Sequence, residues 1–81
     1  MTSMRAKFQI SSVTRFSGGN EKVIFHAVAK NSPYPADGSD EDNTYAHYSP
    51  SAECSITIAD PALRGKFELG QKFYVDFTSA D

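Results

Sequence analysis

Apolar residues recur at every second position in four separate stretches of the chain, a spacing typical of β-strands with one buried face. In the first stretch, residues 5–16, one face carries the apolar residues Ala6, Phe8 and Ile10. The next apolar residue, Val13, falls on the opposite phase. We therefore expect a β-bulge near Ser11 and Ser12, because one extra residue resets the alternation and bends the strand.

Residues 17–21 contain Gly18, Gly19 and Asn20, which tolerate positive φ, so this segment predicts a hairpin turn. The returning strand is expected over residues 22–30. Val23 and Phe25 lie on one of its faces, and the other face also carries apolar residues. Such a pattern indicates a strand that is central in its sheet or covered on both sides.

Residues 31–44 break the pattern. Two prolines remove backbone donors, and the segment 37–42 carries four acidic residues in six positions. We expect a mobile acidic surface loop here, since the segment offers little apolar surface to bury. Residues 45–48 are expected to be ordered as a short edge strand that ends before Pro50.

The last third of the chain carries the densest structural signals. Residues 52–59 alternate as a strand, with Cys54, Ile56 and Ile58 expected inward. Residues 60–65 predict a one-turn helix, because Asp60 suits the N-cap, Pro61 the first helical position and Gly65 the left-handed residue after the last turn. Leu63 and Phe67 are expected to pack this turn on the sheet. Residues 72–78 predict the final strand, and the expected core of this region is Phe67, Leu69, Phe73, Val75 and Phe77.

These elements predict one small β domain over residues 1–81, with a frayed N-terminus at residues 1–4. The expected fold is a small antiparallel barrel or curled sheet of four or five strands with one short helical turn. A chain of this length buries only about 60% of its unfolded surface, so its core is thin.

Composition narrows the cellular setting. The net charge of −2 does not point to a nucleic-acid-binding domain, and a single cysteine cannot form an internal disulfide. The chain shows neither a signal-peptide pattern nor an apolar run long enough for a membrane span. These features favour a cytoplasmic protein with no membrane contact.

Few residues suggest chemistry. His26 and Cys54 lie on predicted strands and are best interpreted as structural. The acidic run does not match a calcium loop, because Gly38 comes too early and position twelve is Tyr48 instead of glutamate. Phosphate-binding, zinc-binding and nucleophile motifs are missing from the sequence. We therefore expect no enzyme activity, no cofactor and no metal site.

Outward-facing aromatic and basic side chains are the better candidates for binding. Tyrosine is enriched at protein interfaces, and single-stranded nucleic acid binds to stacked aromatic rings in a positive groove. The candidate binding residues are Tyr34, Tyr45, His47, Tyr48, Tyr74, Arg15 and Lys72. Lys7 and Lys30 would add positive charge to such a groove.

Several motifs resemble a family of small proteins encoded by tailed bacteriophages. The motifs are EDNTY at 41–45, YSPS at 48–51, PALRGKF at 61–67 and GQKFYVDFT at 70–78, with AKF and SVT near the N-terminus. The resemblance covers nearly the whole chain, which departs from the usual pattern at Ser49 and Ser79. It implies a phage origin and a host-cytoplasmic location, but no activity.

Together these observations favour a bacteriophage accessory protein that acts as a non-enzymatic binding module, with a protein partner or self-association. One alternative is a single-stranded DNA-binding protein of small-barrel type in a phage replication module. Another is a sponge for a nucleotide signal or an inhibitor of host defence. A structural protein of the virion is a further alternative.

Overall fold

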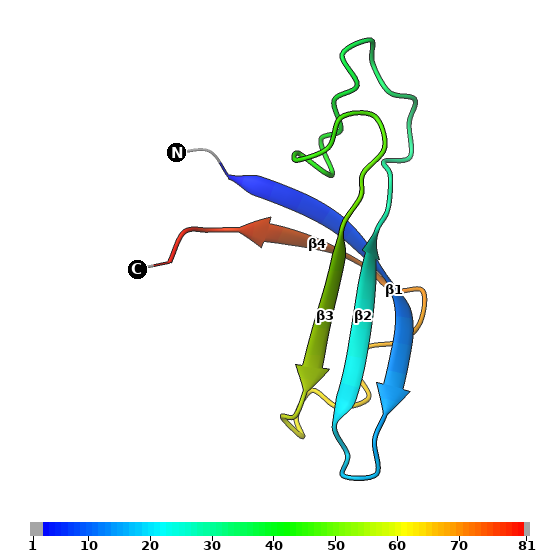
Figure 1. The fold of residues 1–81 in the computed structure, drawn as a ribbon, viewed down its shortest axis with the longest axis vertical. Helices are drawn as coiled ribbons and strands as arrows, with labels where there is room; N and C mark the ends of the chain where they lie inside the picture. Colours follow the sequence, from blue (N-terminus) through cyan, green and yellow to red (C-terminus); the bar gives the residue numbers. More distant parts are fainter. Residues whose placement is uncertain (1–2, 81) are drawn as a thin grey trace.

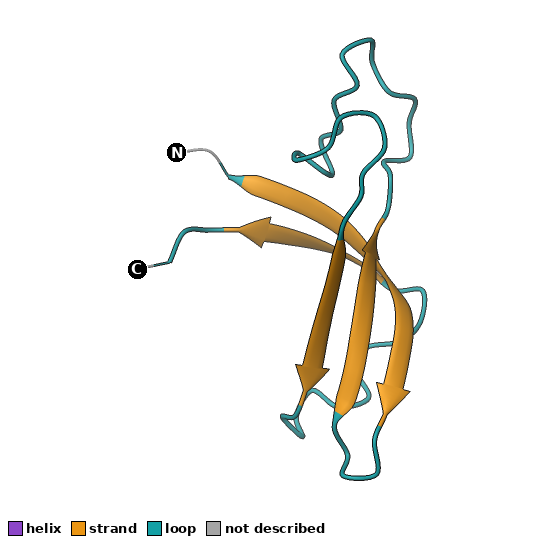
Figure 2. Cartoon of the chain, viewed as in Figure 1, coloured by secondary structure: helices purple, strands orange, loops and turns teal. Residues whose placement is uncertain are grey.

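The computed structural model describes residues 3–80, which form one curled antiparallel sheet of four strands in the order β3-β2-β1-β4 (Figure 1). The strands are β1 (Met4–Arg15), β2 (Glu21–Ala27), β3 (Glu53–Ile58) and β4 (Lys72–Phe77). β3 and β4 are its two edges, so the curl forms half of a barrel and leaves it open. This confirms the expected fold class, although the described residues contain strands, turns and loops but no helix (Figure 2).

β1 is the longest strand and joins the two halves of the sheet. Its residues 4–9 pair with β4, and its residues 8–15 pair with β2. The predicted bulge is confirmed, because Ile10 is opposite Phe25 while Ser12 is opposite Ile24. Before this bend, the N-terminal half of β1 runs beside β4, and these two segments diverge from β2 and β3 (Figure 1).

β2 is a central strand, as its two partly apolar faces predict, with β1 on one side and β3 on the other. It is shorter than the predicted strand 22–30. The preceding turn is closed by a hydrogen bond of 2.9 Å from the Phe16 N–H to the Asn20 carbonyl, and Gly19 has the positive φ expected there.

The core occupies one face of the sheet, inside the curl. Its buried apolar residues are Ala6, Phe8, Ile10, Val23, Phe25 and Ile58. Phe25 contacts aromatic rings on both sides, with centroids 6.2 Å from Phe8 and 6.0 Å from Phe73. The core is therefore built mainly by β1 and β2, the two central strands.

The expected core near the C-terminus is only partly correct. Phe67, Phe73 and Val75 pack against the margin of the core, but Leu69 and Phe77 are 67% and 47% exposed. Phe77 ends edge strand β4, which has only β1 as a neighbour, and Leu69 lies in the turn before β4, so no further strand flanks either side chain. Ile56 on the other edge, also predicted inward, is 47% exposed for the same reason.

Residues 60–65 form consecutive turns instead of the predicted helix. Asp60 caps the segment as expected, since its Oδ1 accepts the Ala62 N–H at 3.0 Å and its carbonyl accepts the Leu63 N–H at 3.0 Å. Gly65 then adopts a φ of 75°, which ends the segment before a full helical turn repeats. The side chain of Leu63 is 46% exposed, so the prediction that it packs on the sheet was wrong.

The predicted edge strand at residues 45–48 is also wrong, because this segment consists of turns and bends. Tyr48 has a φ of 68°, which an extended strand does not accommodate. Thr44, just before it, exchanges two hydrogen bonds of 2.9 Å with Arg5 of β1. At the N-terminus β1 begins at Met4, whereas residues 1–2 of the predicted frayed end lie outside the described residues.

Candidate functional site

The loop between β2 and β3 is held to the sheet by a group of polar residues that are buried or partly buried, which we call the loop anchor: Lys7, Asp40, Asp42 and Asn43. Asn43 is 0% exposed and connects three segments. Its Oδ1 accepts the Lys7 N–H at 2.8 Å, and its Nδ2 donates to the Val28 carbonyl at 2.8 Å. The side-chain amide thus stands in for a strand partner of β1.

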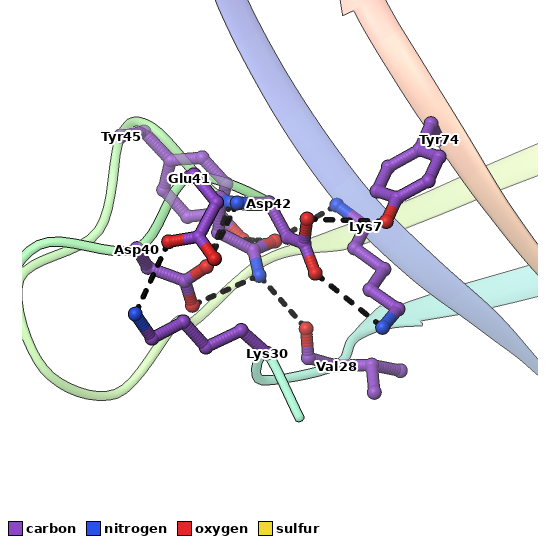
Figure 3. Close-up of polar contacts among 9 residues, drawn as sticks. Lys7, Val28, Lys30, Asp40, Glu41, Asp42, Tyr45 and Tyr74 are labelled. Carbon is purple, nitrogen blue, oxygen red and sulfur yellow. Dashed lines mark hydrogen bonds and ion pairs between the residues drawn. The ribbon is translucent and has the colours of Figure 1, made fainter. Parts of the chain in front are cut away.

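Charged groups of the acidic segment pair with lysines in and beside this anchor (Figure 3). Lys7 Nζ lies 3.4 Å from Asp42 Oδ2, and Lys30 Nζ lies 3.1 Å from Glu41 Oε2. Asp40, only 3% exposed, accepts the backbone N–H groups of Asp42 and Asn43. The acidic run is therefore partly buried and paired, in contrast to the solvated surface that its composition suggests.

Two of the candidate binding tyrosines donate hydrogen bonds to the loop anchor. The hydroxyl of Tyr74 donates to Asp42 Oδ1 at 3.1 Å, and the hydroxyl of Tyr45 donates to Asn43 Oδ1 at 3.3 Å. Burial, with a further contribution from the charge of Asp40, raises the pKa of Tyr45. Tyr45 and Tyr74 therefore have structural contacts of their own.

A second aromatic group lies farther out in the same loop. The ring of Tyr48 packs edge-on against Tyr34 at 6.2 Å and against His47 at 4.7 Å. Its hydroxyl donates to the Ala36 carbonyl at 2.7 Å, which closes the ring over Gly38. Three of the predicted site residues, Tyr34, His47 and Tyr48, are thus brought together.

The two basic candidates lie elsewhere. Arg15 ends β1 beside the hairpin turn, at the opposite end of the molecule from this loop (Figure 1), and its Nε is 3.3 Å from buried Glu21 Oε2. Lys72 begins β4 and is exposed. The structure does not gather the seven candidates into one site.

An open apolar cavity lies inside the curl, on the face that carries the core. Its volume is about 410 Å³, and its walls come from β1, β4 and the segment that leads into β3. Residues that line it include Met4, Phe8, Tyr45, Cys54, Val75 and Phe77. Sequence reasoning placed Cys54, Val75 and Phe77 inward, but alternation alone does not show that the space between them stays unfilled.

The outer face of the sheet holds a row of three polar residues from three strands. Ser11 Oγ is hydrogen-bonded to His26 Nδ1, and His26 Nε2 lies 3.3 Å from Glu53 Oε2. A nucleophile, a base and a carboxylate in line suggest a catalytic triad. The side chains of His26 and Glu53 are 52% and 64% exposed, however, and the side chains of Phe8 and Cys54, which line the cavity, lie on the opposite face of the sheet. We therefore interpret the row as cross-strand pairing.

Among the described residues, no three side chains of metal-binding type gather into a group that could hold an ion. Residues 3–80 also contain no helix long and apolar enough to cross a membrane.

Comparisons with protein-family models, curated proteins and solved structures found no match for this chain. The resemblance to phage proteins therefore stays a prediction.

Proposed function

We propose that this chain is a non-enzymatic interaction module that binds a polypeptide in the open cavity of its half-barrel. The observation that carries the proposal is the cavity itself, about 410 Å³ with predominantly apolar walls. Met4 and Phe77 at its rim are 40% and 47% exposed. Burial of such side chains by a partner is favourable, at roughly 25 cal/mol per Å² of apolar surface.

A polypeptide fits this site better than a small molecule does. The cavity opens between two edge strands, β3 and β4, whose outer backbone groups are unpaired within residues 3–80. An extended segment can hydrogen-bond to such an edge and place alternate side chains against the apolar wall. In the setting that the sequence resemblance implies, the protein is a bacteriophage accessory protein that acts on a phage or host factor in the host cytoplasm.

The alternative of single-stranded DNA binding has less support. It requires a positive groove beside stacked aromatic rings. Lys7, Lys30 and Arg15 instead lie within 3.4 Å of acidic side chains, and Tyr45 and Tyr74 donate their hydroxyls within the loop anchor. Titration of a labelled oligonucleotide at low salt separates the two functions, since salt-dependent binding would favour the alternative.

Affinity capture with matched variants tests the proposal. Phe77→Glu places a charge at the rim of the cavity, whereas Phe16→Glu places the same charge at an aromatic residue beside the hairpin turn, outside the cavity. Both side chains are about half exposed, at 47% and 51%, so neither change should unfold the protein. We expect a protein from a bacterial lysate to bind the unchanged chain and Phe16→Glu but not Phe77→Glu. Equal recovery by all three would overturn the proposal.

A further inference from the structure

We propose that β4 pairs with β4 of a second copy of this chain, antiparallel, with Lys72 opposite Asp76 of the partner subunit. The inference assigns the outer edge of β4 to a second copy and leaves the cavity wall and the edge of β3 to the partner of the proposed function, so it goes beyond that function. If it fails, binding of another polypeptide in the cavity is unaffected.

The edge of β4 is available for pairing. β4 is the last strand in the order of the sheet and pairs only with β1, through residues 4–9. Its six residues alternate between the two faces, with Phe73, Val75 and Phe77 on the core side. An antiparallel partner must place residues of the same face opposite one another. Each allowed register is therefore related to the next by a shift of two residues along the strand.

One of these registers places opposite charges across from each other. With Tyr74 opposite its own counterpart, Lys72 is opposite Asp76 and Phe73 is opposite Val75 of the second copy. Two-fold symmetry repeats the Lys72–Asp76 pair, so the interface gains two opposite-charge pairs. A shift of two positions either way places Tyr74 opposite Lys72 or opposite Asp76, and both charge pairs are lost.

Both charged groups can make this contact. Lys72 is exposed, and the carboxylate of Asp76 is 55% exposed even though Arg5 binds it at 2.7 Å. A carboxylate has about four acceptor sites, so an ammonium can join the guanidinium there. Charges on edge strands usually prevent pairing between sheets. Opposite charges spaced as they are in β4 prevent pairing in other registers and favour this one.

β3, the other edge strand, lacks such a pattern of opposite charges. β3 reads ECSITI, in which Glu53 is the only charged residue. No antiparallel self-pairing within β3 can place opposite charges across from each other. β4 is therefore the edge that specifies a second copy in a single register, and the paired sheets would place Phe73 and Val75 of the two copies side by side on the core face.

Sedimentation measurements on charge variants test the inference. Unchanged protein should show, at high concentration, a mass twice the 8.9 kDa of the chain. Lys72→Glu should weaken the dimer at least about tenfold, because two like-charge pairs replace two attractive ones. Lys22→Glu makes the same charge change on central strand β2 and should leave the dimer intact.

A mixing experiment excludes simple misfolding as the cause. In the double variant Arg5→Asp with Asp76→Lys, the ion pair between β1 and β4 is kept with its signs exchanged. This double variant should also be monomeric, because the new lysine faces Lys72 of its partner. A mixture with Lys72→Glu should restore the dimer, since both cross-copy pairs are then attractive. A monomeric unchanged protein, or a mixture that stays monomeric, overturns the inference.

A crosslink checks the register directly. In a Cys54→Ser background, Tyr74→Cys places two thiols opposite each other, with Cβ atoms about 4.5–5.5 Å apart, and a short bifunctional maleimide should link the two copies. Thr78→Cys is the control. In this register its counterpart lies eight positions along the strand, roughly 26 Å away, so the short reagent should not link it. Equal crosslinking of the two variants would contradict the proposed register.

Discussion

The backbone N–H of Lys7 donates a hydrogen bond of 2.8 Å to Oδ1 of Asn43, a residue 36 positions later that is completely buried. The acceptor of this N–H is therefore a side-chain amide and not the backbone of another strand, while β4 pairs with Lys7 from the other side through Tyr74. The contact fixes the position of a long loop that has no regular secondary structure of its own. Its energetic weight follows from burial, because a polar group that loses its partner inside a protein costs far more than one in water.

Asn43→Ala should destabilise the fold by about 2–3 kcal/mol, because it leaves the Lys7 N–H and the Val28 carbonyl without their partner. Urea denaturation followed by circular dichroism measures the change. Asn31→Ala, at an exposed position of the same loop, should change the free energy of unfolding by less than about 0.5 kcal/mol. Equal effects of the two variants would show that the loop anchor is not important for stability.

Gly38→Ala should also destabilise the protein, whereas Gly18→Ala should not. Gly38 has a φ of 74°, and a Cβ there would lie 2.6 Å from the ring of Tyr48. A Cβ at Gly18 meets no atom within 4 Å. We expect a loss of about 1–3 kcal/mol for Gly38→Ala from backbone strain and displacement of the ring. Thermal unfolding of both variants provides the comparison, and similar midpoints would contradict the close packing of Tyr48 on Gly38.

Phe25→Ala should cost about 3–5 kcal/mol and leave the protein largely unfolded, since Phe25 is 7% exposed and lies between Phe8 and Phe73. From the sequence we expect Phe73→Ala to unfold the protein, but Phe73 lies at the margin of the core and its truncation should cost less. Leu69→Ala, at a side chain that is 67% exposed, is the control. A larger loss for Phe73→Ala than for Phe25→Ala would show that the core is centred on β4.

Acid should weaken the attachment of β4 to β1. The hydrogen bond from Arg5, and then its charge, lower the pKa of Asp76. A carboxyl group whose pKa is lower in the folded state stabilises the protein above its ordinary pKa, and this stabilisation is lost as the pH falls through the lowered value. Asp76→Asn should therefore reduce the difference between the urea midpoints measured at about pH 6 and about pH 2.

The matched control for this pH dependence is Glu68→Gln, which removes one exposed negative charge away from Arg5. Both variants should be measured at a protein concentration low enough to keep the chain monomeric. An unchanged pH dependence in Asp76→Asn would show that the pair of 2.7 Å between Arg5 and Asp76 does not contribute to folding.

Local patterns predicted the strands well because alternation is a local property. The bulge between Ile10 and Ser12 is visible in the sequence as a change of phase, and the partly apolar outer face of β2 indicated its central position. The exposure of Ile56 and Phe77 could not be predicted in the same way. This exposure depends on which strands lie at the edges of the sheet, and the alternation of apolar and polar residues gives no information on strand order.

The loop anchor shows a second limit of sequence reasoning. Asn43 lies within an acidic, proline-containing stretch that reads as a solvated loop, yet its partners Lys7 and Val28 lie 36 and 15 positions away. A buried asparagine is recognised only once those backbone groups are seen to converge. The open cavity is equally invisible in the sequence, because it is defined by the space between β3 and β4 and not by any motif.

The pairing of β1 with β4 also has a consequence for the order of folding. Arg5 and Asp76, which face each other across this pair, are 71 positions apart in the chain. The β1–β2 hairpin closes across a short turn, whereas the β1–β4 pair must close a loop of nearly the whole chain. We therefore expect the hairpin to form early, β4 to dock last, and the protein to fold slowly for its size because its contacts are so non-local.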